Sequence, residues 1–353
     1  MRRRAGPAVE TVLLKQAKHV RRLLLLAARD RGPLPEILQI EATNICNARC
    51  VFCPRERMER KQGVMDMALY RRIVDEAAAL GIPNVRLHNY GESFIDREIV
   101  EKIRYAKSRG IPRLGLISNG SLITEALARG IVEAGLDAIN ISVDAAGKET
   151  FERTRIGLNY DRVIENIERL LRVRGELGAE RPKLILSFVR QEDGDEGDEA
   201  ERGMGAPRAR SLAGCRGPRH SNDERAFIEK WSRVADKVHV TDLHNWAGTL
   251  HDRSSVQFPC YRPWLTFTVL WDGRVALCCA DFDAKVVLGD LRTSAISDVW
   301  NSDAFRAIRR AHLDHGGPDI CHGCDLPKKD SPLWIRKLMG RPFSPASPRR
   351  PVV

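Results

Sequence analysis

The sequence lacks a long hydrophobic run. Its longest apolar patch near the start, residues 23–28, is far too short to cross a bilayer. The basic residues 2–4 could open a signal peptide, but Lys15, Lys18 and Arg21 interrupt the apolar stretch that should follow. No small-residue cleavage site follows either. We therefore expect a cytoplasmic protein without a membrane-bound part.

The sequence also lacks the features of a nucleic-acid-binding protein. Its formal net charge is +11, but the basic residues are spread along the chain and mixed with 47 acidic ones. No recognition helix and no alternation of basic and aromatic residues stands out. We expect a solvated surface with basic ends and no nucleic-acid partner. The positive electrostatic potential of such a surface would also suit a mildly acidic substrate or an acidic electron-donor protein.

Cysteine, in contrast, is plentiful. The chain of 353 residues has nine cysteines, which in a cytoplasmic protein argues against disulfides and for metal or redox chemistry. The length suffices for one large domain with an appendage, or for two domains.

Short apolar strands alternate with helical segments through the first two thirds of the chain, which predicts parallel βαβ units and an α/β sheet or barrel. The expected strands are 36–42, 84–89, 113–118, 138–144, 183–189 and 237–243, and the helical segments between the early ones are 66–80, 97–109 and 122–135.

Three regions fall outside this alternation. Residues 1–34 contain an amphipathic helix over 8–30. Residues 191–222 are rich in Gly, Pro and charge with almost no large apolar side chains, which predicts a flexible insertion. Past 255 the chain changes to short strands and turns. We expect an N-terminal helix at 1–34, a main domain at 35–250, a second domain at 251–330 and a basic, Pro-rich tail at 331–353.

The first cysteine motif is Cys46-x3-Cys50-x2-Cys53. This spacing could also mark one stripe of a helix, where free cysteine packs well. However, a predicted strand ends just before the motif and Pro54 follows it, which favours a loop. Three thiolates on a short loop can bind three irons of a [4Fe–4S] cluster, and the fourth iron then stays open to an external chelate.

Residues 41–54, with these cysteines, resemble the cluster-binding loop of the radical S-adenosylmethionine (SAM) superfamily. The resemblance implies an α/β fold, a partial (β/α)6 TIM-like barrel with its chemistry at the C-terminal ends of the strands. It also implies two cofactors, SAM and the [4Fe–4S] cluster that SAM chelates. Reductive cleavage of SAM in this family gives a 5′-deoxyadenosyl radical, which abstracts a hydrogen atom from a substrate C–H bond.

Further motifs resemble the family at later strand ends. Asn89-Tyr90-Gly91-Glu92-Ser93 stands where the family usually carries Gly-Gly-Glu-Pro, so that Tyr90 and Ser93 depart from the usual glycine and proline. A carboxylate there suits the ammonium of SAM. Ser118-Asn119-Gly120 and residues 141–144 resemble the next two strand ends. The implied SAM-binding residues are Gly91, Glu92, Ser118, Asn119, Ser142, Asp144 and Arg155.

The second cysteine set is Cys260-x17-Cys278-Cys279 followed by Cys321-x2-Cys324, with a predicted hairpin turn at 271–274. Its spacing alone fits either a zinc site or an iron–sulfur cluster. With Gly273, the set resembles the SPASM domain of many radical SAM enzymes, in its shortened twitch form. The resemblance implies a small α+β domain with a second, auxiliary [4Fe–4S] cluster, bound by Cys260, Cys278, Cys321 and Cys324.

Two cysteines remain. Cys215 lies in the predicted insertion and is taken as incidental. On an extended backbone Cys279 points away from its neighbour Cys278, so it can face the substrate cavity and give a hydrogen atom to a substrate radical. It could equally be a small buried residue, or exchange roles with Cys278.

Twitch-type relatives act on aminoglycosides and other sugar-derived compounds. The resemblance therefore implies an enzyme that abstracts a hydrogen atom from a carbinol C–H of a small carbohydrate-derived molecule. We expect epimerisation with Cys279 as the catalytic hydrogen donor, and an acidic electron donor such as flavodoxin or ferredoxin as the protein partner. Dehydrogenation of an alcohol to a ketone through the auxiliary cluster, peptide maturation and a zinc-stabilised binding module remain alternatives. At predicted strand ends, His88, Asn89, His244, Asn245 and Trp246 line the pocket or simply pack.

Overall fold

A computed structural model describes residues 34–190, 220–250, 260–314 and 316–326. The predicted N-terminal helix, nearly all of the predicted insertion with Cys215, and the basic tail lie outside these residues.

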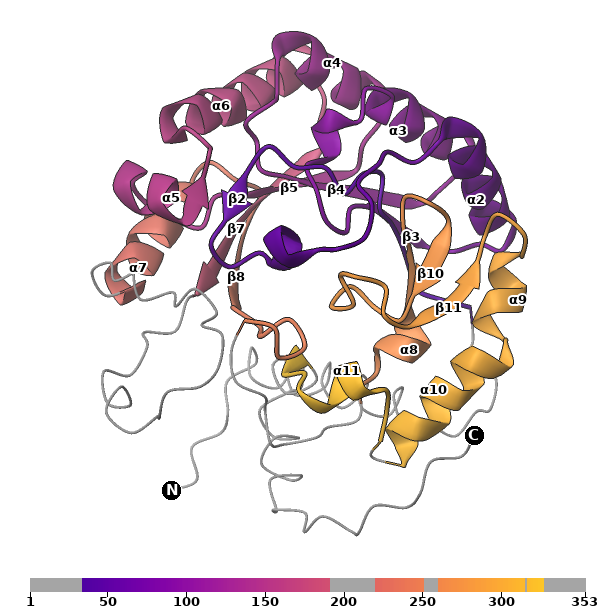
Figure 1. The fold of residues 1–353 in the computed structure, drawn as a ribbon. Helices are drawn as coiled ribbons and strands as arrows, with labels where there is room; N and C mark the ends of the chain where they lie inside the picture. The colour runs from indigo at the N-terminus through magenta and orange to yellow at the C-terminus, as the bar shows by residue number, and fades with distance from the viewer. Residues whose placement is uncertain (1–33, 191–219, 251–259, 315, 327–353) are drawn as a thin grey trace, which may run out of the picture.

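A curved sheet of six parallel strands forms the main part of the molecule (Figure 1). In spatial order the strands are β1 (Ile37–Ile40), β3 (Asn84–Leu87), β4 (Arg113–Ser118), β5 (Ala138–Ser142), β7 (Lys183–Arg190) and β8 (Lys237–Asp242). The helices that connect them lie outside the curved sheet: α2 (Met67–Ala79), α3 (Ile99–Ser108), α4 (Glu125–Glu133), α5 (Lys148–Thr154), α6 (Tyr160–Glu176) and α7 (His220–Trp231). The predicted partial (β/α)6 barrel is confirmed, with differences only at the ends of the elements.

Alternation along the strands separates an apolar outer face from a polar inner one. The outward side chains are buried against the helices and include Leu38, Ile40, Val85, Leu87, Leu114, Leu116, Ile139, Ile141, Leu184 and Leu186. Inward positions carry the polar residues Gln39, Arg86, Asn140, Ser187 and His239, together with a few apolar ones such as Ile117 and Ile185. Burial of the outer face therefore fixes the strand register and leaves polar groups in the lumen.

The C-terminal part continues the same sheet. Strand β9 (Thr266–Val269) pairs in parallel with β1, and β10 (Arg274–Ala276) and β11 (Val287–Asp290) follow in antiparallel order. The predicted turn between β9 and β10 is confirmed, with Gly273 at φ +91°. Four short helices complete this part: α8 (Arg262–Leu265), α9 (Ile296–Trp300), α10 (Asp303–Leu313) and α11 (Asp319–His322). The loop between β10 and β11 extends into the barrel opening (Figure 1).

None of the described helices is long and apolar enough to span a membrane.

Candidate functional site

The first cysteine motif lies in a loop after β1, as predicted, and not in a helix. Part of this loop, β2 (Arg49–Cys50), pairs with β6 (Arg155–Ile156), and the 3-10 helix η1 (Pro54–Arg57) begins directly after Cys53. At its start, the Asn44 side chain donates to the carbonyl of Lys61 at 2.9 Å and accepts from the Gly63 N–H at 2.9 Å. Strand pairing and the hydrogen bonds of Asn44 thus fix the course of the loop without a regular helix.

The three thiols of this loop share one desolvated environment. Burial raises the pKa of Cys46 and Cys50, and raises that of Cys53 to about 12. The charge of Cys50 also raises the pKa of Cys46 and of Cys53, and the charge of Cys46 raises that of Cys53, so the three thiols lie within electrostatic reach of one another. Only a cation can hold three thiolates in such surroundings. The donor set therefore fits three irons of a [4Fe–4S] cluster.

Glu92 lies beside this loop and accepts three hydrogen bonds. Its buried carboxylate accepts hydrogen bonds from the Ser118 hydroxyl at 2.8 Å, the Asn119 N–H at 2.6 Å and the Phe94 N–H at 3.1 Å. Burial raises its pKa, while these donors oppose the rise. Gly91 has φ +86°, and an added Cβ would come within 2.5 Å of the carbonyl oxygen of Thr43. Only glycine fits there, so the backbone of this turn touches the cysteine loop.

Asp144 and Arg155 form a buried ion pair beside the loop. The guanidinium also points Nη1 at the Cys50 sulfur, 3.6 Å away, while its Nε is buried without a hydrogen-bond partner among the described residues. A buried unsatisfied N–H beside the thiols suits the carboxylate of a ligand such as SAM. Ser142, at the end of β5, makes no side-chain hydrogen bond to any described residue.

The structure thus brings Glu92, Ser118 and Asn119 together by direct hydrogen bonds, and Asp144 and Arg155 in a second pair. The Asn119 side chain also donates to Asn47, inside the cysteine motif, at 2.8 Å. Their roles as SAM ligands remain predictions.

The cysteines of the second set gather at the end of the C-terminal part. Burial raises the pKa of Cys321 to about 12 and of Cys324 to about 11, and raises that of Cys278 well above its usual value. Cys260 and Cys324 raise the pKa of both Cys278 and Cys321, so these four thiols are neighbours.

This donor set suits an iron–sulfur cluster. Across the described segments, no three His, Cys, Asp or Glu side chains are grouped closely enough to hold a single metal ion.

A loop after β8 bridges the two cysteine sets. The Trp246 indole donates to the carbonyl of Phe52, between Cys50 and Cys53, at 2.9 Å. The Asn245 side chain donates to the carbonyl of Gly323, next to Cys324, at 2.7 Å. Two of the predicted strand-end residues therefore position the cysteine loops.

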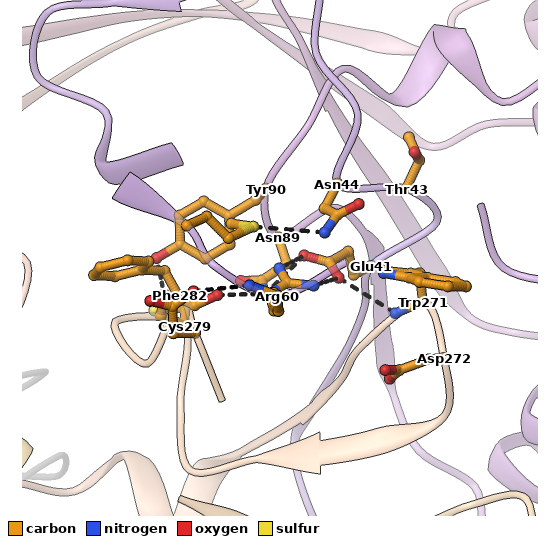
Figure 2. A network of polar contacts seen from close by, with 12 residues as sticks. Glu41, Thr43, Asn44, Arg60, Asn89, Tyr90, Trp271, Asp272, Cys279 and Phe282 are labelled. Carbon is orange, nitrogen blue, oxygen red and sulfur yellow. Dashed lines mark hydrogen bonds and ion pairs between the residues drawn. The ribbon is translucent and has the colours of Figure 1, made fainter. Parts of the chain in front are cut away.

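Figure 2 shows a polar network that the sequence analysis missed. The buried carboxylate of Glu41 forms an ion pair with Arg60, and also accepts from the Trp271 N–H at 3.3 Å. Arg60 donates through Nε to the carbonyl of Phe282 at 2.5 Å, in the loop that carries Cys279. In the sequence, only Glu41 itself, a charged residue directly after the buried strand β1, indicated this network. Nothing there marked Arg60, because its partners are distant along the chain.

Cys279 lies where this loop reaches the barrel. The Tyr90 hydroxyl donates to its carbonyl oxygen at 2.5 Å, and Arg262 donates through Nη1 to its sulfur at 3.2 Å. The charge of Cys279 acts to raise the pKa of Arg86 on the inner face of β3, so the thiol lies within electrostatic reach of this guanidinium. Sequence reasoning overlooked both Arg86 and Arg262.

Comparison with known proteins agrees with this geometry. Residues 40–177 match the sequence model of the Radical SAM superfamily, and residues 260–325 match that of an iron–sulfur cluster-binding domain, SPASM. A tungsten-containing aldehyde ferredoxin oxidoreductase cofactor-modifying protein of Pyrococcus furiosus is 28% identical over 155 residues, 43% of each chain. The chain thus spans less than half the length of the curated relatives it matches.

Solved structures are similar in fold. BtrN in complex with AdoMet and 2-DOIA has a TM-score of 0.54 and 19% identity, covering 83% of this chain and 94% of its own. Streptococcus suis SuiB bound to the precursor peptide SuiA has a TM-score of 0.61 and 14% identity, covering 94% of this chain and 78% of its own.

Proposed function

The chain belongs to the radical SAM superfamily and carries a C-terminal SPASM iron–sulfur domain. On this basis we propose that it inverts the configuration of a carbinol carbon in a small sugar-derived molecule. In the proposed reaction one hydrogen atom leaves the carbinol carbon. Cys279 then returns a hydrogen atom to the opposite face, and the net result is epimerisation.

In this family, the cluster and SAM together supply a 5′-deoxyadenosyl radical, the species that takes the hydrogen atom. Cys46, Cys50 and Cys53 are the proposed ligands of that cluster, and Cys260, Cys278, Cys321 and Cys324 those of the auxiliary one. Glu92 would accept the ammonium of SAM, while the free Nε of Arg155 would donate to its carboxylate.

The observation that carries the proposal is the position of Cys279. Its loop enters the barrel opening, and its half-buried thiol lies within electrostatic reach of Arg86 in the lumen. The thiol would transfer its hydrogen atom to the substrate radical and become a thiyl radical. One electron from an acidic flavodoxin- or ferredoxin-type donor and one proton would then restore it.

Dehydrogenation to a ketone is the second candidate, and a specific contact favours it. Cys279 also raises the pKa of both Cys278 and Cys324, so it lies within reach of the auxiliary centre. If Cys279 is a cluster ligand in place of Cys278, the thiol that reaches the barrel opening is no longer free to donate a hydrogen atom. The substrate radical must then lose a proton and an electron.

Labelled substrates test the proposal. The anaerobically reconstituted, reduced enzyme is incubated with SAM and sugar-derived candidates that carry deuterium at single carbinol carbons. We expect deuterium in 5′-deoxyadenosine. In heavy water, solvent deuterium at the inverted carbon indicates epimerisation, whereas a product lighter by two hydrogen atoms indicates dehydrogenation. Absence of 5′-deoxyadenosine with every candidate, including precursor-type peptides, would overturn the proposal.

A further inference from the structure

The lumen of the barrel carries a positive charge, Arg86, that no carboxylate of the described residues pairs with. Arg86 points inward from the middle of β3, because its neighbours Val85 and Leu87 are buried in the outer core. Its side chain is solvent-accessible. It makes no hydrogen bond or ion pair with any residue in the described ranges. An arginine inside a barrel without a partner is unusual, because a guanidinium normally binds a carboxylate or phosphate.

Open space lies beside this guanidinium. In the sheet register Arg86 stands between Gln39 of β1 and Gly115 of β4. The Gln39 amide already donates to Asn89 at 3.0 Å, while an added Cβ at Gly115 would meet nothing within 4 Å. The glycine therefore leaves room in the lumen next to Arg86 for a group that is not among the described residues.

Further polar groups face the same space. His88 follows Arg86 on the same side of β3, and His239 points inward from β8, beside Ser187. The Asn140 side chain accepts from the Ser187 hydroxyl, and its NH₂ group has no acceptor among the described residues. Burial and the charge of Arg86 lower the pKa of His88 to about 4, and burial with Lys237 and Arg86 lowers that of His239. The charge of Arg86 therefore acts on both imidazole rings, and each ring can donate one N–H.

Three carboxylates at the C-terminal edge of the barrel have partners of their own. From β1 to β8, no inward position within the described strands carries a carboxylate. At the C-terminal edge, Glu41 is paired with Arg60, Asp144 with Arg155, and Glu92 accepts three hydrogen bonds. The lumen therefore attracts a negatively charged group from outside the chain.

We propose that the barrel lumen binds an oxyanion group of the substrate, a phosphate ester or a carboxylate, on Arg86, with His88, His239 and Asn140 as additional donors. This inference rests on the proposed function, since it assigns an anionic group to the sugar-derived substrate of the same cavity. A guanidinium binds two oxygens of such a group at once, which fixes its orientation. The oxyanion would thus hold the substrate with its carbinol carbon towards Cys279.

Direct binding of small anions tests the site without turnover. The reconstituted, oxidised full chain is titrated with inorganic phosphate, followed by the 31P line width, and with acetate, followed by the 13C line width. We expect saturable binding that weakens roughly 10- to 100-fold in Arg86→Met, the loss expected for a charge-assisted contact. Arg86→Lys should keep part of the affinity. Arg104→Met removes the same charge from the outer surface of α3 and should change nothing.

Each outcome decides the matter. Tighter binding of phosphate identifies a phosphorylated substrate, and tighter binding of acetate a carboxylate one. If Arg86→Met does not fold, His239→Gln is the second variant, with an expected loss of about 3- to 10-fold. Equal binding by wild type and these variants, or no binding by wild type, overturns the inference. Because no SAM is present, such a result leaves the proposed hydrogen-atom abstraction untouched.

Discussion

The hydroxyl of Tyr90 donates a hydrogen bond of 2.5 Å to the carbonyl oxygen of Cys279. Tyr90 follows β3 of the barrel, whereas Cys279 belongs to the C-terminal domain. The tyrosine ring also contacts Trp246 and Phe282, with centroids 5.6 and 6.3 Å apart. Burial, then the nearby thiols of both cysteine sets, raise the pKa of Tyr90 well above its usual value. The hydroxyl therefore stays protonated and ties the barrel to the C-terminal part, between the two predicted clusters.

Tyr90→Phe should slow product formation about fivefold, because it removes one hydrogen bond of about 1 kcal/mol but keeps the ring contacts. The iron content should not change. Turnover is measured by mass spectrometry of 5′-deoxyadenosine and product. Tyr105→Phe is the matched control, since that hydroxyl bonds to Asp75 on the outer surface at 2.7 Å. An equal loss in both variants would show that the contact with Cys279 has no special role.

Alanine variants of the adjacent Cys278 and Cys279 should differ sharply in iron content and in product formation. Cys279→Ala should retain about eight irons per chain and still form 5′-deoxyadenosine, but should lose the epimerised product. Cys278→Ala should lose the auxiliary cluster and about half of the iron. Anaerobic iron and sulfide analysis with product assays measures both. Loss of iron in Cys279→Ala, with full iron in Cys278→Ala, would exchange the two roles and favour dehydrogenation.

Arg60→Met should destabilise the protein strongly. It leaves the Glu41 carboxylate, which has no solvent exposure, as an uncompensated buried charge. Breaking such a pair costs about 3–5 kcal/mol, so we expect the thermal unfolding midpoint to fall by roughly 10 °C. Arg104→Met breaks an exposed pair with Glu101 and should shift the midpoint by less than about 2 °C. Differential scanning calorimetry under nitrogen measures both. A similar small shift for both variants would contradict the buried-charge argument.

Glu92→Gln should weaken SAM binding by roughly 10- to 100-fold, because a neutral amide replaces the carboxylate that would pair with the ammonium. Equilibrium dialysis with labelled SAM measures the affinity. Glu101→Gln, on the exposed side of α3, is the control for the loss of one negative charge. Unchanged affinity in Glu92→Gln would remove this residue from the SAM site.

Stability should fall on mild acidification, partly through His88. Burial and Arg86 hold its folded-state pKa at about 4, whereas an unfolded histidine titrates near 6.5. Between these values the unfolded chain binds a proton that the folded chain does not. The contribution of neutral His88 to the free energy of unfolding is therefore complete above about pH 6.5 and is lost as the pH falls towards about 4. Urea midpoints measured under nitrogen from pH 7.5 to 5.5 should decline less steeply in His88→Asn. Identical slopes would show that His88 titrates normally.

The sequence by itself determined the family, the fold class and the candidate cysteine ligands. These features are local, because cysteine spacing, strand alternation and glycine turns express their chemistry within a few residues. The turn at Gly273 and the loop at Cys46 could be predicted for this reason.

Only the tertiary structure decided which distant groups meet. It paired Glu41 with Arg60, placed Tyr90 on Cys279, and left Arg86 in the lumen beside Gly115 without a partner in the described part of the chain. No sequence pattern contains such information, because strand register and the course of long loops bring these residues together from separate elements. Burial then sets the energy of each contact, since a charge or hydroxyl has a large effect only where water is excluded.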